Sequence, residues 1–289
     1  MTQFQPGSGP TALRILLGTQ LRRLREEKGI SREDAGHVIR GSESKISRME
    51  LGRVGFKERD VADLLTYYGV AEGEARSAVM NLLERANEPG WWHRFSDLLP
   101  SWFQAYVGLE EAAARIRTYE VQFVPGLLQT KEYARAVITA GSAGIGAAEI
   151  SRRVDLRMER QRVLDRGDGP VFWAVIDEAA LRRPIGGADV MRGQLEHLLE
   201  LMRQPNITIQ VMPFSFGGHS AEGGAFSVLR FNDHELPDIV YVEQLASALY
   251  LDKREEVDRY SEVMERLCAA STTPEATVDI LQKIISDII

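Results

Sequence analysis

One short stretch of the chain carries polar side chains at a spacing that suits contact with nucleic-acid bases. Ile46 and Met49, three residues apart, would point to one side of a helix over residues 42–51. Arginine can fork onto guanine, glutamate can accept from the cytosine amino group, and serine reads either base weakly. We therefore predict that this helix enters the major groove of double-stranded DNA. Its expected contacts to bases or nearby phosphates are Ser42, Glu43, Ser44, Lys45, Ser47 and Arg48.

Two tight turns must hold this helix against a compact apolar base. Gly29 ends the preceding helix, and Ser31 can cap the next one, because its hydroxyl can accept an otherwise unpaired backbone N–H. Arg40-Gly41 breaks the chain again, and Ser42 or Ser44 can cap the third helix. Arg32 and the N-terminus of the second helix are expected to bind the phosphate groups of the DNA backbone.

The same stretch resembles the helix-turn-helix of the XRE (Cro/C1 repressor-like) family. That family opens with L-R-x-L-R-x-x-x-G-(L/I)-S, present here over 21–31, and closes with I-S-R-(I/M)-E-x-G, present over 46–52. Three positions depart from the pattern: Arg32 replaces a frequent Gln, Gly36 a usual Ala, and Arg40 a usual Gly, which leaves the turn uncertain by a residue. Because one such helix covers few base pairs, we expect a homodimer on half-sites about one turn apart.

Apolar spacing predicts five helices in the first 87 residues. The first helix begins near Thr11 and carries Leu13, Leu17, Leu21 and Leu24; a fourth spans 57–68, and a fifth spans 72–86 with Ala75, Val79, Leu82 and Leu83 on one stripe. The expected organisation is a disordered tail (1–10), a five-helix, lambda-repressor-like DNA-binding domain (11–87), an aromatic linker (88–108) and an α+β regulatory or partner-binding domain (109–289).

Charge is distributed unevenly along the chain. The 289 residues carry a net charge of −7, but residues 11–59 hold 12 Lys and Arg against 7 Asp and Glu, so this segment is +5 and the remainder is −12. A basic head on an acidic body fits a DNA-binding domain joined to a sensing or partner-binding domain. Cys268 is the single cysteine, and the sequence contains neither a signal peptide nor a membrane span, so we expect a cytoplasmic protein that is nucleoid-associated when bound to DNA.

Aromatic residues crowd the stretch that follows the five helices. They are Trp91, Trp92, Phe95, Trp102, Phe103 and Tyr106. Such a cluster either packs the linker onto the C-terminal domain or forms a ligand cage or partner surface. The segments G-W-W, L-P-x-W-F, Y-V-x-L-E, R-I-x-T-Y-E and V-P-G-L-L-Q-T-x-x-Y-A, all within 90–134, resemble the WhiJ-like regulators of actinobacteria. That resemblance implies an XRE head, a C-terminal domain without an assigned biochemical role, and a small companion protein encoded nearby.

The remainder of the chain reads as a small sheet covered by helices. Strands are expected over 171–176, 207–212, 225–231 and 238–242, and helices over 147–166, 189–202, 254–270 and 274–285. Six arginines on the helix over 147–166 alternate with acidic residues, which is typical of a solvated face. The Gly-rich loop over 213–224 lacks the spacing of a phosphate-binding loop and could form a flexible flap.

No catalytic, cofactor or metal site is expected. The five histidines include no H-E-x-x-H spacing, and no G-x-S-x-G nucleophile elbow occurs. His219 with Glu222, or His234 with Glu235, could be argued as metal ligands, but each is interpreted as a loop side chain. Cys268 is expected to be a buried thiol in a helix.

These observations predict a DNA-binding transcriptional regulator and leave its input open. The WhiJ-like resemblance implies a signal from the companion protein, in development or antibiotic production. A small-molecule effector is the alternative, with Trp91, Trp92, Trp102, Phe103, Tyr106 and His219 as its candidate ligand or partner surface. An antitoxin-like sequestering module that acts on its own promoter is a further alternative.

Overall fold

The computed structural model describes residues 10–52, 54–142, 144–232 and 236–288, which form two compact units. The first unit comprises the described parts of 1–96, 103–112 and 232–236, and the second comprises 97–102, 113–231 and 237–289. The predicted disordered tail lies outside the described residues, apart from Pro10, which begins a helix. The expected helical N-terminal region and α+β C-terminal region are both confirmed.

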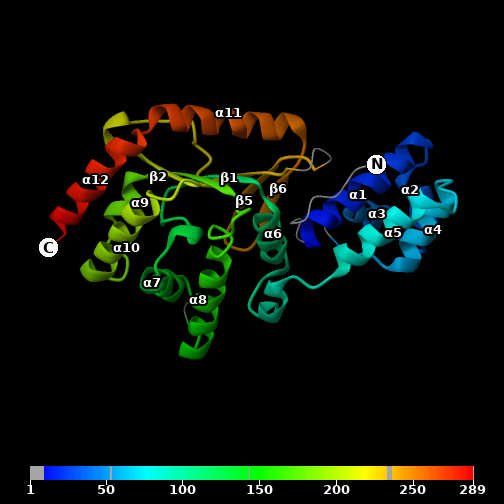
Figure 1. Cartoon of the computed structure of the whole chain (residues 1–289), viewed down its shortest axis with the longest axis horizontal. Helices are drawn as coiled ribbons and strands as arrows, with labels where there is room; N and C mark the ends of the chain where they lie inside the picture. Colours follow the sequence, from blue (N-terminus) through cyan, green and yellow to red (C-terminus); the bar gives the residue numbers. More distant parts are fainter. Residues whose placement is uncertain (1–9, 53, 143, 233–235, 289) are drawn as a thin grey trace. The chain divides into compact units, whose positions relative to one another are not determined.

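Five helices build most of the first unit (Figure 1). They are α1 (Pro10–Glu27), α2 (Arg32–Val38), α3 (Glu43–Glu50), α4 (Glu58–Tyr67) and α5 (Glu74–Asn87), followed by η1 (Trp91–Phe95) and α6 (Ser101–Ala112). The apolar stripe of α1 is buried at Leu13, Leu17 and Leu21. The prediction for the fifth helix is wrong at its start, because α5 begins at Glu74 after Gly73, and Ala75 is exposed.

A six-stranded mixed sheet forms the centre of the second unit, in the order β3-β2-β1-β4-β5-β6. β1 (Arg115–Glu120), β2 (Val171–Asp177) and β3 (Ile207–Met212) run parallel, whereas β4 (Phe226–Arg230), β5 (Ile239–Glu243) and β6 (Ala248–Leu251) pair antiparallel in succession. Four strands match the predicted ones to within a residue or two at each end. β1 and β6 were not predicted.

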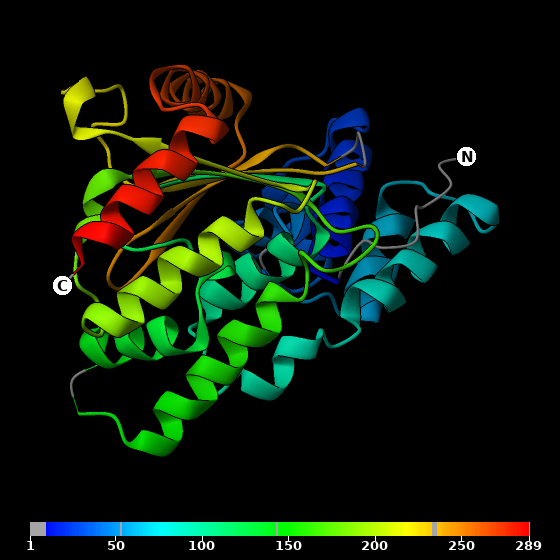
Figure 2. The ribbon, with the colours of Figure 1, turned by 60° about the vertical axis from the view of Figure 1, so that its left-hand side comes forward.

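Helices cover both faces of this sheet (Figures 1 and 2). α11 (Arg254–Ala270) lies on one face, and α7 (Lys131–Gly141), α8 (Ala147–Gln161) and α10 (Ala188–Leu201) lie on the other. α12 (Pro274–Asp287) contacts α10 and β3, and the short helices η2 (Gly126–Leu128), α9 (Glu178–Arg182) and η3 (Phe214–Phe216) follow β1, β2 and β3. Among the described residues, no helix is long and apolar enough to cross a membrane.

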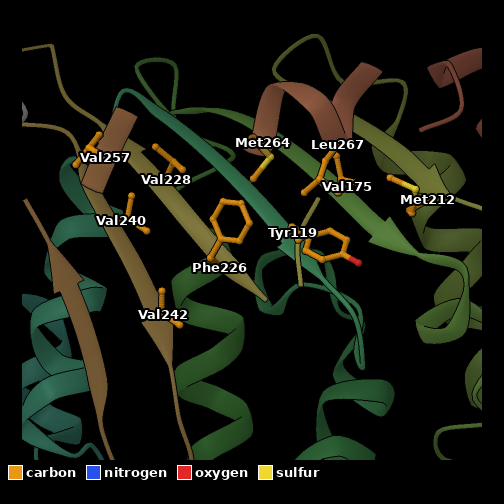
Figure 3. Close-up of a cluster of buried hydrophobic side chains, with 11 residues drawn as sticks. Tyr119, Val175, Met212, Phe226, Val228, Val240, Val242, Val257, Met264 and Leu267 are labelled. Atoms are coloured by element: carbon orange, nitrogen blue, oxygen red, sulfur yellow. The ribbon is translucent and has the colours of Figure 1, made fainter. Parts of the chain in front are cut away.

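The core under α11 joins side chains from five strands and the helix. Tyr119, Val175, Met212, Phe226 and Val240 lie beneath Met264 and Leu267 of α11 (Figure 3). Burial of this apolar area is the main favourable term that holds the helix on the sheet. Cys268 packs against the edge of the cluster and is half-buried, and burial raises the pKa of its thiol.

The helix that precedes β2 departs from the predicted solvated face. α8 ends at Gln161 rather than at 166, and Arg160 is buried. Arg157 is half-buried and donates to Gln129 Oε1 at 2.8 Å. Only part of the arginine face is therefore turned to solvent, as at Arg152 and Arg162.

Candidate nucleic-acid interface

The predicted base-contacting helix forms as α3, with its apolar side inward. Ile46 and Met49 are buried, and Ser42 caps the helix by accepting from the backbone N–H of Lys45 at 3.2 Å. Ser44 thus lies inside the first turn and is not the cap. The exposed side chains are Glu43, Ser44 and Arg48, whereas Lys45 and Ser47 are half-buried.

α2 also begins at its predicted cap residue, Ser31. The Ser31 hydroxyl accepts from the backbone N–H of Asp34 at 3.0 Å, and Glu33 and Asp34 lie in the first turn, where negative charge suits the helix dipole. Arg32 follows the cap and is partly exposed, so it lies beside backbone N–H groups of the kind that bind phosphate.

The turn between α2 and α3 has Arg40, not Gly41, in the left-handed conformation. Arg40 adopts a φ of +51°, the left-handed conformation that glycine usually supplies. The backbone N–H of Gly41 then donates to Gly36 O at 2.8 Å and closes the turn. A Cβ atom on Gly36 would lie 3.1 Å from Gly41 O, so the glycine permits close contact between the two segments.

Two glycines let α1 approach the C-terminal end of α3. A Cβ atom on Gly18 would lie 2.4 Å from Met49 O, closer than real side chains come. Gly52, with a φ of +64°, lies against the backbone of Ile15 in the same way. Backbone meets backbone at both points, which fixes the position of α3 on α1.

A buried ion network ties α3 to α1 and α2. Glu50 is 4 % exposed and accepts from the guanidinium groups of both Arg25 and Arg32, the second at 2.9 Å. Arg25 also donates to Ile30 O at 2.8 Å, and the hydrogen bond to Glu50 raises the pKa of Arg25. Tyr68 beside them is also buried, and burial raises the pKa of its hydroxyl. Hydrogen bonds between charged groups are stronger in such a buried environment.

Two predicted contact residues therefore already have protein partners. Arg32 Nε donates to Glu50, and Lys45 Nζ pairs with Asp60 Oδ2 of α4 at 2.6 Å. The Arg32 guanidinium has further N–H groups to offer, because it carries five donors in all. The Lys45 ammonium is directed toward α4, and its side chain is about one-third exposed.

The residues of the predicted ligand or partner surface are divided between the two units. In the first unit, Trp91 Nε1 donates to Glu111 Oε2 at 2.8 Å, and the buried Trp92 packs against Gly108. Phe103 stacks on the buried Tyr106, with ring centroids 5.7 Å apart. These contacts lie within the first unit.

The remaining members of that surface belong to the second unit. Trp102 O accepts from the Tyr250 hydroxyl. His219 hydrogen-bonds the Tyr119 hydroxyl through Nε2 at 2.9 Å, and its Nε2 lies 3.9 Å from Asp177 Oδ2. His219 Nδ1 also accepts from the backbone N–H of Ala221, so the ring links its own loop to the end of β1. His234 and Glu235 lie outside the described residues.

Metal-ligand geometry does not arise in the part of the chain that the structure describes: no three His, Cys, Asp or Glu side chains converge there. Glu222, which could have joined His219 as a ligand, is exposed.

Comparison with known proteins gave two matches, which do not overlap. A family model for a helix-turn-helix domain matches residues 16–78, which include α2, the turn and α3. A model for a domain of unknown function, DUF5753, matches residues 103–283. Searches of curated proteins and of solved structures found no match. The geometry of α2 and α3 and the first of these matches together support a DNA-binding regulator.

Proposed function

Because the chain belongs to the family defined by the domain of unknown function DUF5753 and carries a helix-turn-helix domain ahead of it, we propose that it is a sequence-specific transcriptional regulator. The observation that carries the proposal is α3 itself, a capped helix fixed by Gly18 and Glu50 with polar side chains outward. In this proposal the protein works in the cytoplasm on the nucleoid and is not an enzyme.

Each predicted contact has a proposed role. Arg48 is exposed at the end of α3 and would fork onto guanine, while Glu43 would accept from cytosine. Ser42, Ser44 and Ser47 would bond to bases or nearby phosphates. Arg32, oriented by Glu50, and Lys45, beside Asp60, would contact phosphate.

We further propose that the protein reads a two-fold site as a homodimer. One α3 is eight residues long and spans only a few base pairs, so two copies on half-sites about one turn, or roughly 34–36 Å, apart would supply the needed specificity. This arrangement fits the resemblance to XRE regulators.

The acidic second unit is proposed to receive the signal. Of the −12 carried outside 11–59, the second unit (97–102, 113–231 and 237–289) holds −5, so it would not attract DNA and would leave the basic segment over 11–59 as the contact surface. A small companion protein, encoded nearby and acting in development or antibiotic production, is the proposed source, as the WhiJ-like resemblance implies. Co-purification from the native host tests this: a small protein in stoichiometric amount supports it, and its absence under all growth conditions contradicts it.

DNA contact is tested by selecting a duplex from a random pool and measuring its affinity for three variants. Arg48→Ala should weaken specific binding by about 1–3 kcal/mol and relax the preference at one base pair. Arg32→Ala should weaken all sequences alike and flatten the salt dependence by about one ion. Arg254→Ala removes the same charge from the exposed start of α11 and serves as the control. Unchanged affinity and preference in Arg48→Ala would remove the contact assignment.

A further inference from the structure

Lys45, one of the predicted DNA contacts, is held by a carboxylate of the neighbouring helix. Its Nζ atom lies 2.6 Å from Oδ2 of Asp60, the third residue of α4. The Asp60 side chain is 12 % exposed and the Lys45 side chain is 32 % exposed, so both groups are largely withdrawn from water. Charges in such a position are screened by salt much less than exposed charges are.

The place of Lys45 on α3 leaves it able to make one further contact. Successive helical residues are rotated by about 100°, so Lys45 lies about 100° from Ser44 and about 60° from Arg48. Those two side chains are exposed and define the middle of the outward face, and Lys45 lies at its margin. An ammonium group has three N–H donors, of which Asp60 takes one. A donor at the margin of the face is suited to the phosphate backbone that borders the groove.

Gly41 makes room for the Lys45 side chain on its way to α4. A Cβ atom on Gly41 would lie 2.8 Å from Lys45 Cδ, closer than real side chains come. The backbone conformation does not require glycine there, because the left-handed residue of this turn is Arg40. The missing side chain at Gly41 therefore serves the path of the lysine, which is a second observation that the pair with Asp60 is built into the turn.

The pair with Asp60 also removes most of the net charge that Lys45 can present to DNA. Binding to random DNA depends on cations that displace counterions from the phosphates. If Lys45 left Asp60 for a phosphate, the carboxylate would remain without this partner at a site where only 12 % of it is exposed, which is costly. Lys45 therefore contributes little to non-specific binding while Asp60 holds it.

We propose that Asp60 is a specificity-determining residue that fixes Lys45 in place and compensates its charge. Lys45 then contacts DNA by position: its remaining donors meet one phosphate when α3 is seated on its own site, without the entropy cost of ordering a free lysine. On random DNA the same lysine adds almost nothing. This inference rests on the proposed function, because it assigns a role within DNA binding.

The test measures the affinity of the full-length protein for a random duplex and for the duplex selected from the pool, at several salt concentrations. Asp60→Asn keeps the shape of the side chain and frees Lys45 as a mobile cation. Random-duplex binding should gain about one phosphate contact, so its gain over wild type should be about 3.5 times larger at 50 mM than at 200 mM salt. The selected duplex gains charge but loses the fixed geometry, so the ratio of selected to random affinity should fall about three- to tenfold.

Two further variants separate this effect from a general change of charge. Glu58→Gln removes the same charge from an exposed position in the first turn of α4 and should leave the salt dependence unchanged. Asp60→Asn with Lys45→Met lacks both members of the pair. It should bind the random duplex as the wild type does and bind the selected duplex more weakly, because the phosphate contact is lost. An ion pair with only a structural role would lower stability and leave both the salt dependence and the ratio unchanged.

Two results would overturn the role of Asp60. One is a salt dependence of random-duplex binding in Asp60→Asn that equals that of wild type or of Glu58→Gln; the other is an unchanged ratio. Amide exchange of α3 and α4 shows whether each variant is folded. If Asp60→Asn unfolds, Gly41→Ala decides, because its Cβ displaces Lys45 while both charges stay: the ratio should fall, and an unchanged ratio refutes the role.

Failure of this inference is distinguishable from failure of the proposed function. A wild-type protein that prefers one duplex, together with an Asp60→Asn variant that keeps the same ratio and salt dependence, refutes the role of Asp60 alone. A wild-type protein without preference for any duplex refutes the proposed function.

Discussion

Replacing Glu50 tests how α3 is held in position for DNA. Glu50 and Arg25 are 4 % and 6 % exposed, and Glu50 also binds Arg32 at 2.9 Å. Glu50→Leu leaves Arg25 buried with Ile30 O and the half-exposed Glu26 as its remaining partners. Removing one partner of a buried ion pair costs about 3–5 kcal/mol, a large part of a total stability of roughly 5–15 kcal/mol.

Replacing both buried partners should cost less than replacing one. Arg25→Met with Glu50→Leu removes the stranded charge and keeps much of the volume, so the double variant should recover much of the loss. Arg32 loses its partner too, but its side chain is 36 % exposed and water can solvate it. Glu33→Leu, at an exposed position of α2, is the control and should cost less than about 1 kcal/mol.

The assay is amide hydrogen exchange of peptides from α1, α2 and α3 in the full-length protein. Local exchange separates this effect from the second unit, which a single unfolding curve would not. A loss of 3 kcal/mol raises exchange of the slowest amides by about 150-fold. Equal protection in wild type and Glu50→Leu, or a double variant that exchanges faster than Glu50→Leu, would refute the reasoning.

The remaining predictions concern the backbone around α3. Arg40→Gly should stabilise the first unit by about 0.5–1 kcal/mol, because Arg40 occupies the left-handed region of the backbone. Arg40→Ala removes the same charge but keeps the strained conformation and is the control. Equal effects of the two substitutions on thermal unfolding would contradict the conformational explanation. Gly18→Ala should destabilise by about 1–3 kcal/mol and weaken duplex binding, because its Cβ would meet Met49 O and Glu50 O. Gly193→Ala, on α10 with open space around it, should be neutral or stabilising; a similar loss at both glycines would remove the packing argument.

The helix-turn-helix could be predicted closely because its signals are local. The cap at Ser31 and the buried pair Ile46 and Met49 follow from residue type and spacing alone, and the structure confirms them. For the cap of α3 the sequence left Ser42 and Ser44 open, and the structure has Ser42 there. The sequence left the turn between α2 and α3 open, because its glycine is Gly41 and the family usually has glycine one position earlier. The structure places the left-handed residue of this turn at Arg40.

Elements without a local signal were missed. β1 carries Arg115, Arg117 and Glu120, charges that argue against a central strand, yet Arg117 lies over the Trp173 ring and Glu120 ends the strand. β6 is only four residues long at the edge of the sheet. Both β1 and β6 form because they pair with strands that are distant in the sequence. The alternation of apolar and polar residues within a short window does not reveal such pairing.

The candidate sites divide in the same way. The proposed DNA contacts lie within one short segment, so spacing alone gathers them. Tyr119, Asp177 and His219 come together only because β1, β2 and the loop over 213–224 are adjacent in the fold, and nothing in their local sequence marks them. Pairing of Arg32 with Glu50, and of Lys45 with Asp60, likewise depends on the tertiary fold.

Chromatin immunoprecipitation in the native host tests the central claim most directly, with the wild type and Arg48→Ala expressed at equal levels. The account predicts discrete occupied sites that share a two-fold motif with half-sites about one turn apart, and loss of those sites in the variant. Uniform background occupancy by the wild type, or an identical map from Arg48→Ala, would contradict it.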